Sequence, residues 1–340
     1  MDVTALDNDI ILLAHGDGGA LTHDLITGLF QKHFTGQSLK LLTDAALLPH
    51  LEGHMAFTTD SFVVDPLFFP GGNIGELAVY GTVNDLAVSG ACPRYLAVAF
   101  VIEEGLPLAT LEKVVQAMAA ACRETKIEIV AGDTKVVPKG QVDKLFITTT
   151  GLGAMLPGVD LGYHRLQPGD MVLVNGQLGQ HALTIMASRY NLDLGGNIQS
   201  DCAPLAGIIS ELLQQIPGVK LMRDLTRGGL ATAVKEIALS AQIDIYLDEE
   251  HIPVTPAVQA AADILGLDPL YLANEGKFLA VIAPENKKAA LEVLKAYPLG
   301  KQAAIIGEVH TGEGNAFLRT AWGGTKFLDL LAGAPLPRLC

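Results

Sequence analysis

The chain ends in a cysteine, Cys340, which follows the sequence Pro-Leu-Pro-Arg-Leu. Proline fixes φ and lacks an N–H, so this segment cannot continue a helix or join the interior of a sheet. We expect residues 331–340 to form an extended, mobile tail. A thiol on such a tail can visit more than one site, which is useful for a covalent carrier. An ordinary disordered chain end would look the same in the sequence.

Three aspartates share an apolar setting. Asp60 ends one predicted strand, Asp133 follows another, and Asp85 lies inside a predicted helix, residues 74–88, that is apolar nearly all round. A carboxylate in such a helix is unfavourable without a partner. Taken singly, each aspartate can be a turn residue or a buried hydrogen-bonding group. Together, with few basic residues nearby, they favour convergence on a divalent cation such as Mg²⁺.

Two further segments have the residue types of a phosphate site. Asp224 and Arg227 lie just before a predicted helix, whose first N–H groups and the arginine are suited to a phosphate. Near the N-terminus, Gly16, Gly18 and Gly19 can form a backbone cradle for phosphates or a simple flexible turn. The sequence contains neither a Walker A motif nor GxGxxG.

Two residues are candidates for proton transfer. Lys135 directly follows Gly-Asp-Thr, and Glu275 lies in a polar turn, residues 273–277, between two apolar segments. Both residue types act as general acids or bases when a site positions them. Either can also be an ordinary surface charge, which is the usual place for Lys and Glu.

Hydrophobic periodicity predicts two α+β halves, with Pro and Gly marking a boundary near residues 155–168. In the first half we expect helices at 20–34, 74–88 and 108–125 and strands at 55–64, 95–103, 128–131 and 144–151. In the second we expect strands at 171–175, 243–247, 278–282 and 303–308, helices at 179–190, 203–215, 228–241 and 284–296, and a final hairpin-like stretch. The expected domains are 1–155 and 156–330, followed by the tail.

Composition excludes several classes of partner. Of 340 residues, 49% are hydrophobic and the net charge is −14, which argues against nucleic acid and anionic membranes. No apolar run reaches the length of a membrane span, and the first residues, Met1-Asp-Val-Thr, lack the basic and apolar regions expected of a signal peptide. The four cysteines form no CxxC pair and the histidines form no HxxxH or HxH spacing. We therefore expect reduced thiols and a cytoplasmic protein.

Taken in order, seven motifs resemble those of the HypE family of hydrogenase maturation factors, within the ATP-dependent superfamily of aminoimidazole ribonucleotide synthetase and selenophosphate synthetase. They are residues 58–64, 69–79, 84–87, 131–135, 223–229, 274–277 and 337–340. The aspartate motifs are typical of the whole superfamily. The terminal cysteine after Pro-Arg-Leu is typical of HypE.

The resemblance implies an α+β fold with two α/β sandwich-like domains of the aminoimidazole ribonucleotide synthetase type. It implies a homodimer in which the N-terminal halves pair into a barrel, with ATP sites at the interface, and a flexible tail. The residues then expected to bind ATP are Gly16, Gly18, Gly19, Asp60, Asp85, Asp133, Thr134, Lys135, Asp224 and Arg227, and the expected Mg²⁺ ligands are the four aspartates.

The resemblance also implies a reaction. A HypF-like carbamoyltransferase places a carboxamide on Cys340, and ATP drives its dehydration to a thiocyanate, with Lys135 and Glu275 moving the two N–H protons. The cyanide then passes to iron on a HypC–HypD-like scaffold, for the iron centre of a [NiFe]-hydrogenase.

Two alternatives have different requirements. A selenophosphate synthetase-like enzyme would share the aspartates, but its catalytic Cys or selenocysteine usually lies in an N-terminal Gly-rich loop. This chain has no cysteine before Cys92. A non-enzymatic scaffold would use the terminal thiol only to bind a metal or a partner. ATP hydrolysis that requires a carbamoylated Cys340 distinguishes the HypE-like function from both.

Overall fold

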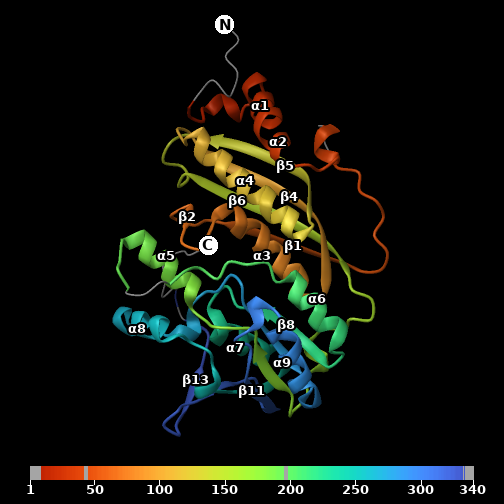
Figure 1. Cartoon of the computed structure of the whole chain (residues 1–340), viewed down its shortest axis with the longest axis vertical. Helices are drawn as coiled ribbons and strands as arrows, with labels where there is room; N and C mark the ends of the chain where they lie inside the picture. The colour runs from red at the N-terminus through yellow and green to blue at the C-terminus, as the bar shows by residue number, and fades with distance from the viewer. Residues whose placement is uncertain (1–8, 42–44, 195–197, 332, 334–340) are drawn as a thin grey trace.

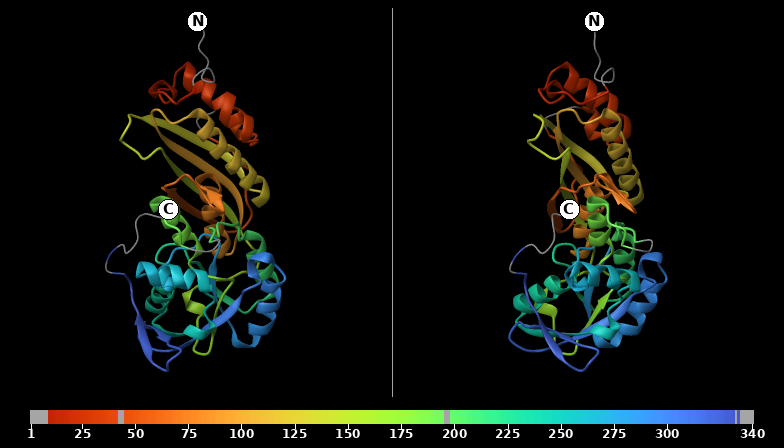
Figure 2. Two further views of the ribbon diagram at one scale, coloured as in Figure 1. Left: turned by 60° about the vertical axis from the view of Figure 1, so that its left-hand side comes forward. Right: turned by 90° about the vertical axis from the view of Figure 1, so that its left-hand side faces the viewer.

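The computed structural model describes residues 9–41, 45–194, 198–331 and 333. Its helices and strands form two units, the first red to yellow in Figure 1 and the second green to blue, stacked along the long axis of the molecule (Figures 1 and 2). The predicted tail, with Cys340, lies outside the described residues apart from Leu331 and Gly333. Among the described residues, no helix has the length and apolarity needed to cross a membrane.

The first unit is built on a four-stranded sheet in the order β1-β6-β4-β5. Its strands are β1 (Met55–Phe62), β4 (Ala91–Glu103), β5 (Glu128–Val137) and β6 (Leu145–Met155). β4 and β5 are parallel, and the other pairs are antiparallel. One face packs against α3 (Ile74–Val88), α4 (Leu108–Thr125) and the N-terminal helical segment of α1 (Ala20–Leu25), η3 (Ile26–Phe30) and α2 (Gln31–His33). A small hairpin joins β2 (Phe68–Phe69) and β3 (Gly72–Asn73).

The second unit contains a seven-stranded sheet in the order β13-β12-β9-β11-β7-β10-β8. The strands are β7 (Met171–Val174), β8 (Val219–Asp224), β9 (Ile243–Asp248), β10 (Phe278–Ile282), β11 (Ala304–Thr311), β12 (Ala316–Arg319) and β13 (Thr325–Leu328). α7 (Gly229–Ala241) covers one face, while α6 (Ala206–Gln215) and α9 (Lys287–Lys295) cover the β7-β10-β8 part of the other. α5 (Gln180–Tyr190) and α8 (Pro256–Leu265) complete the helices of this unit. Short turns of 3₁₀ helix are η2 (Leu13–His15), η4 (Ser38–Leu41), η5 (Tyr163–Arg165), η6 (Glu249–His251), η7 (Pro269–Tyr271), η8 (Pro284–Asn286) and η9 (Pro298–Gly300).

α3 is shared by both units. Asn73 caps its start, because the Asn73 Oδ1 accepts from the N–H groups of Gly75 and Glu76 at 2.9 and 3.1 Å. Most of the helix packs in the core of the first unit, whereas Ala87 and Val88 at its end pack in a core of the second. A helix that is apolar all round must be buried on all sides, which explains this central place.

The predicted α+β composition and most predicted elements are confirmed, including the helices at 74–88 and 108–125 and the strand at 278–282. One prediction at a site residue is wrong. Asp133 does not follow a strand but lies inside β5, because pairing with β4 continues as far as Val137. Asp224 lies just before a helix, α7, as predicted, and it ends β8, a strand that the sequence analysis missed along with α8.

Candidate functional site

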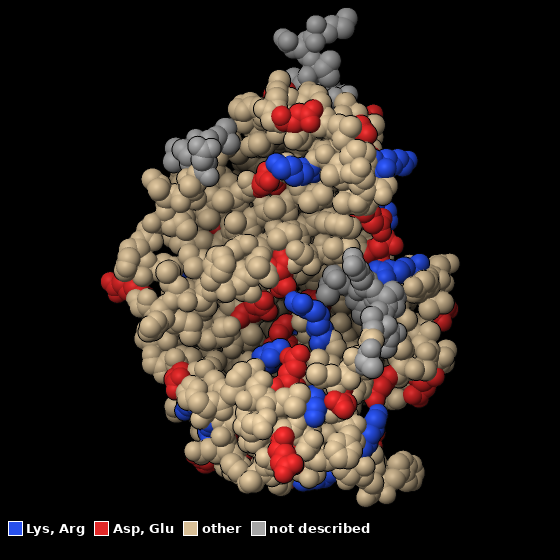
Figure 3. Space-filling model, turned by 180° about the vertical axis from the view of Figure 1, so that it is seen from behind, with Lys and Arg blue, Asp and Glu red and all other residues tan. Residues whose placement is uncertain are grey.

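A cleft of about 990 Å³ lies between the two units. β1 and α3 line it from the first unit, and β8 and α7 line it from the second. Five of the predicted site residues line this cleft: Asp60, Asp85, Asp224, Arg227 and Glu275. On one face of the molecule, acidic and basic side chains gather in a hollow about midway along the long axis (Figure 3).

Hydrogen bonds hold the three carboxylates of the cleft. Alternation along β1 directs Thr58 and Asp60 toward α3, where the Thr58 hydroxyl donates to Asp85 Oδ2 at 2.9 Å. The Arg227 guanidinium, whose side chain is 85% exposed, donates to Asp60 Oδ1 at 3.2 Å. The Thr226 hydroxyl donates to Asp224 Oδ2 at 2.8 Å.

Burial, and then the like charges of the neighbouring carboxylates, disfavour ionisation of Asp85 and Asp60. Burial, together with the charges of Asp224 and Asp60, raises the pKa of Asp85 to about 7, against an opposing hydrogen bond from Thr58. Burial also raises the pKa of Asp60, although Arg227 opposes the shift. Such a cluster attracts a cation. Within residues 9–41, 45–194, 198–331 and 333, however, no three His, Cys, Asp or Glu side chains are already arranged to hold a metal ion.

Asp133 and Lys135 lie elsewhere in the first unit. They project from β5, at the opposite edge of the sheet from β1, and their side chains are 62% and 63% exposed. The register places Gly132 level with Asp60, across three strand spacings of about 4.8 Å, or about 14 Å. Within one chain, the structure therefore does not bring Asp133 to Asp60 and Asp85.

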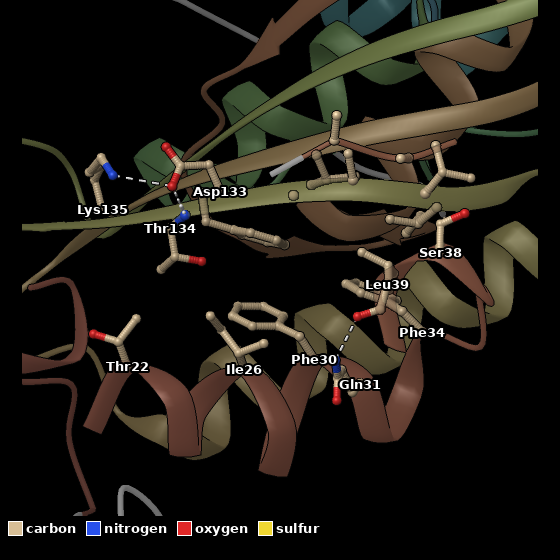
Figure 4. A pocket seen from close by; sticks show the side chains of 18 of the residues that line it. Thr22, Ile26, Phe30, Gln31, Phe34, Ser38, Leu39, Asp133, Thr134 and Lys135 are labelled. Atoms are coloured by element: carbon tan, nitrogen blue, oxygen red, sulfur yellow. Dashed lines mark hydrogen bonds and ion pairs between the residues drawn. The ribbon is translucent and has the colours of Figure 1, made fainter. Parts of the chain in front are cut away.

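A second pocket, of about 270 Å³, lies between β5 and the N-terminal helical segment. Figure 4 shows Thr134 pointing into it toward Ile26 and Phe30, while Asp133 and Lys135 point away on the other side of β5. Lys135 Nζ contacts Asp133 Oδ1 at 3.2 Å.

The Gly-rich segment lies beside β5. Gly16 and Gly18 line the pocket between β5 and the N-terminal helical segment, and Gly19 is the N-cap of α1. Gly18 has a φ of +80°, a conformation that favours glycine, and its N–H donates to the Thr22 hydroxyl at 3.0 Å. The candidate phosphate cradle therefore lies beside β5, the strand that holds Asp133 and Lys135, and not in the cleft that Asp85 lines.

Glu275 is not a surface residue, because only 4% of it is exposed. It stands between η7 and β10, and its turn is bound through buried polar side chains that the sequence analysis did not select. These are Asn84, which directly precedes Asp85 on α3, together with Asn175 and Asp201. Thr58 and Thr226 were also missed as partners of the aspartates. Their position within the same motifs as Asp60 and Asp224 was the available signal.

Comparison with known proteins identifies the family. Residues 42–155 match the N-terminal domain, and residues 167–318 the C-terminal domain, of the family described as AIR synthase related protein. The carbamoyl dehydratase HypE of Escherichia coli K12 is 48% identical over 335 residues, which cover 97% of this chain and 99% of that protein.

The chain belongs to the HypE carbamoyl dehydratase family.

Solved HypE structures confirm the predicted two-domain fold. A crystal structure of hydrogenase maturation protein HypE in complex with ATP matches with a TM-score of 0.93 and 45% identity, covering 97% of this chain and 99% of that one. The chain of a HypE–HypF complex matches with a TM-score of 0.79 and 43% identity, covering 90% and 99%. The chain is thus an enzyme, a carbamoyl dehydratase of hydrogenase maturation.

Proposed function

We propose that the chain uses ATP to convert an S-carboxamide on its own Cys340 into a thiocyanate, the source of the cyanide ligand of a [NiFe]-hydrogenase iron centre. The observation that carries this proposal is the acidic cleft with Arg227 and the buried Glu275, in a HypE-family chain that ends in cysteine. The related HypE structure in complex with ATP supports ATP as the second substrate.

The reaction has two bond-breaking steps. The carboxamide oxygen attacks the γ-phosphorus of ATP, ADP leaves, and one N–H proton is removed, giving an iminophosphate. The C–O bond then breaks, phosphate leaves, and loss of the second N–H proton completes the C≡N bond. Phosphorylation is needed because an amide oxygen is a poor leaving group. We assign the two proton transfers to Glu275 and Lys135, with Lys135 also neutralising phosphate.

The residues of the cleft fit Mg²⁺. Its donors are carboxylate oxygens, which Mg²⁺ prefers, and their mutual repulsion is relieved by a cation. Asp60, Asp85 and Asp224 would hold the ion from one chain. Bound Mg²⁺ would offset negative charge on the phosphates. Arg227, which reaches Asp60 from the surface, is free to turn toward a phosphate because most of its side chain is exposed.

We propose that the remaining part of the site comes from a second copy. β1, which holds Asp60, and β5, which holds Asp133 and Lys135, are the two edges of one sheet. Two such sheets that pair into a barrel bring β5 of one copy to β1 of the other. Among the described residues, no helix covers the other face of the sheet, which includes Met55 and Phe57, 58% and 71% exposed. Exposed apolar side chains of this kind are expected where a face packs against a partner.

Mixing two inactive variants tests this shared site. Asp60→Ala and Lys135→Ala are co-expressed with different affinity tags and assayed for dehydration of carbamoylated Cys340. In a mixed dimer one site has both defects and the other has neither, so random pairing restores about a quarter of the wild-type sites. A site contained within one chain predicts no recovery, since every chain then carries one defect. A monomeric mass by light scattering would also refute the dimer.

We propose a separate role for each of the three parts of the chain. Residues 1–155 bind ATP and dimerise, residues 156–330 provide the other wall of the cleft, and residues 331–340 present Cys340. The HypE–HypF complex supports a HypF-like carbamoyltransferase as one partner. A HypC–HypD-like iron scaffold is the proposed acceptor of cyanide. A cytoplasmic location agrees with the free thiols of Cys92, Cys122 and Cys202.

Mass spectrometry of Cys340 tests the reaction itself. The peptide should gain one carbamoyl group from the carbamoyltransferase and then lose one water when ATP and Mg²⁺ are added. Cys340→Ala should bind ATP normally and acquire neither adduct. A carbamoyl or cyano group on Cys92, Cys122 or Cys202 instead would overturn the proposal.

A further inference from the structure

Buried polar side chains bind the backbone of the turn that carries Glu275. The N–H groups of Glu275 and Gly276 both donate to the carboxylate of Asp201, at 3.2 Å each. Lys277 Nζ donates to the same carboxylate at 2.9 Å, and the two side chains are only 8% and 2% exposed. The carbonyl of Gly276 accepts from Asn175 Nδ2 at 3.2 Å.

The carbonyl of Glu275 itself is bound by Asn84. Asn84 Nδ2 donates to this carbonyl at 3.3 Å and to the carbonyl of Ala203 at 3.1 Å. Asn84 Oδ1 accepts from the N–H of Leu205, just before α6, at 2.7 Å. Asn84 is 4% exposed, so these three bonds replace the water that its amide would otherwise bind.

Asn84 belongs to a different unit from Asn175 and Asp201, the other side chains that bind the turn. Asn175 and Asp201 belong to the second unit, as Glu275 does, whereas Asn84 lies on α3 of the first unit. It is the immediate neighbour of Asp85, which lines the cleft. The Asn84 amide therefore ties the backbone of Glu275 to the helix that positions Asp85.

We propose that Asn84 is a positioning residue, which sets the position of Glu275 in the cleft relative to Asp85. The proposal rests on the proposed proton-transfer role of Glu275. A carboxylate can take a proton only within hydrogen-bonding reach of it, and a displacement of about 1 Å can lower a rate about 100-fold. The bond from Asn84 joins the Glu275 backbone to the first unit, and a shift between the units without this bond would move Glu275 relative to Asp85.

A double-mutant cycle of Asn84→Ala and Glu275→Gln tests this role. The full-length chain, carbamoylated at Cys340, is mixed with ATP and Mg²⁺, and thiocyanate formation is timed by mass spectrometry. We expect Asn84→Ala to slow dehydration about tenfold to 100-fold and to change the Kd for ATP less than about threefold. In the Glu275→Gln background, Asn84→Ala should then slow dehydration less than about threefold further.

Asn73→Ala is the matched control, because it removes the cap of the same helix, and the hydrogen bonds described above for its side chain are with Gly75 and Glu76 at the start of that helix. It should dehydrate at the wild-type rate. A wild-type rate for Asn84→Ala, or losses in the double variant that multiply in full, would overturn the positioning role. A wild-type rate for Glu275→Gln would instead remove the proposed catalytic role of Glu275. If Asn84→Ala does not fold, Asn84→Ser takes its place, and failure of both to fold would assign Asn84 to stability alone.

Discussion

Replacing Asp85 by asparagine should stabilise the chain when no divalent cation is present, and the gain should grow with pH. In the folded chain, burial and the charges of Asp224 and Asp60 raise the pKa of Asp85 from 3.8 to about 7. Between these two pH values the folded state retains a proton that the unfolded state has lost. The wild-type chain therefore loses stability as pH rises from about 4 to about 7. Asparagine keeps the shape of the side chain but cannot ionise.

The size of the effect follows from the shift. A difference of about 3 pH units, at about 1.4 kcal/mol each, gives about 4 kcal/mol above pH 7. This is an upper limit, because Asp60 and Asp224 share the repulsion and can relax when one charge is removed. We therefore expect Asp85→Asn to raise the free energy of unfolding by about 2–4 kcal/mol at pH 8. The gain should be less than half as large at pH 5.

Urea unfolding in the presence of a chelator, at pH 5, 6, 7 and 8, measures this difference. Asp133→Asn is the matched control, because Asp133 is 62% exposed and pairs with Lys135, so its effect should stay within about 0.5 kcal/mol. A gain for Asp85→Asn that is the same at pH 5 and pH 8 would show that the ionisation of Asp85 is not its cause. A loss of stability at pH 8 would refute the reasoning altogether.

Three further substitutions follow from the structure. Lys277→Met leaves the buried Asp201 carboxylate without its ion-pair partner and should lower the free energy of unfolding by about 3–5 kcal/mol, measured in urea; the double variant with Asp201→Asn should recover most of it. Gly276→Ala places a methyl group against the backbone oxygen of Asp201, so it should slow dehydration by displacing Glu275, with ATP affinity unchanged in calorimetry. Phe57→Lys puts a charge on the uncovered face of the first sheet and should give a monomer in light scattering, whereas a stable Phe57→Lys dimer would argue against pairing through this face.

The sequence predicted elements well where local periodicity decides them. α3 and α4 were found with their full lengths, because an apolar or amphipathic run bounded by Asn73 or by Pro107 has no competing structure. The strand predicted at 128–131 was too short, because Gly-Asp-Thr at residues 132–134 resembles a turn, whereas β5 continues to Val137. There the parallel ladder with β4 extends the strand, which is a non-local interaction that overrides local preference.

The site shows the same limit. Asp85 was selected because a carboxylate in an apolar helix needs a partner, whereas Asp60 was selected at the end of a predicted strand and Glu275 in a polar turn between two apolar segments. Asn84 lies in the motif at residues 84–87, but neither this motif nor the sequence around Asp201 tells which distant backbone groups the two side chains bind. Asn84 binds residues about 120 and 190 positions away along the chain. Only the packing of the two units identifies it.

Strand order explains why the sequence could not decide whether one chain or two make the site. The polar residues at 58–60 and 133–135 are equally good candidates in the sequence, and nothing local tells which strands are neighbours. In the structure, β6 and β4 separate β1 from β5, and this order keeps Gly132, the neighbour of Asp133, about 14 Å from Asp60. On the proposed dimer, the same separation that divides the residues within one chain brings the β1 edge of each copy to the β5 edge of the other, and forms two equivalent sites.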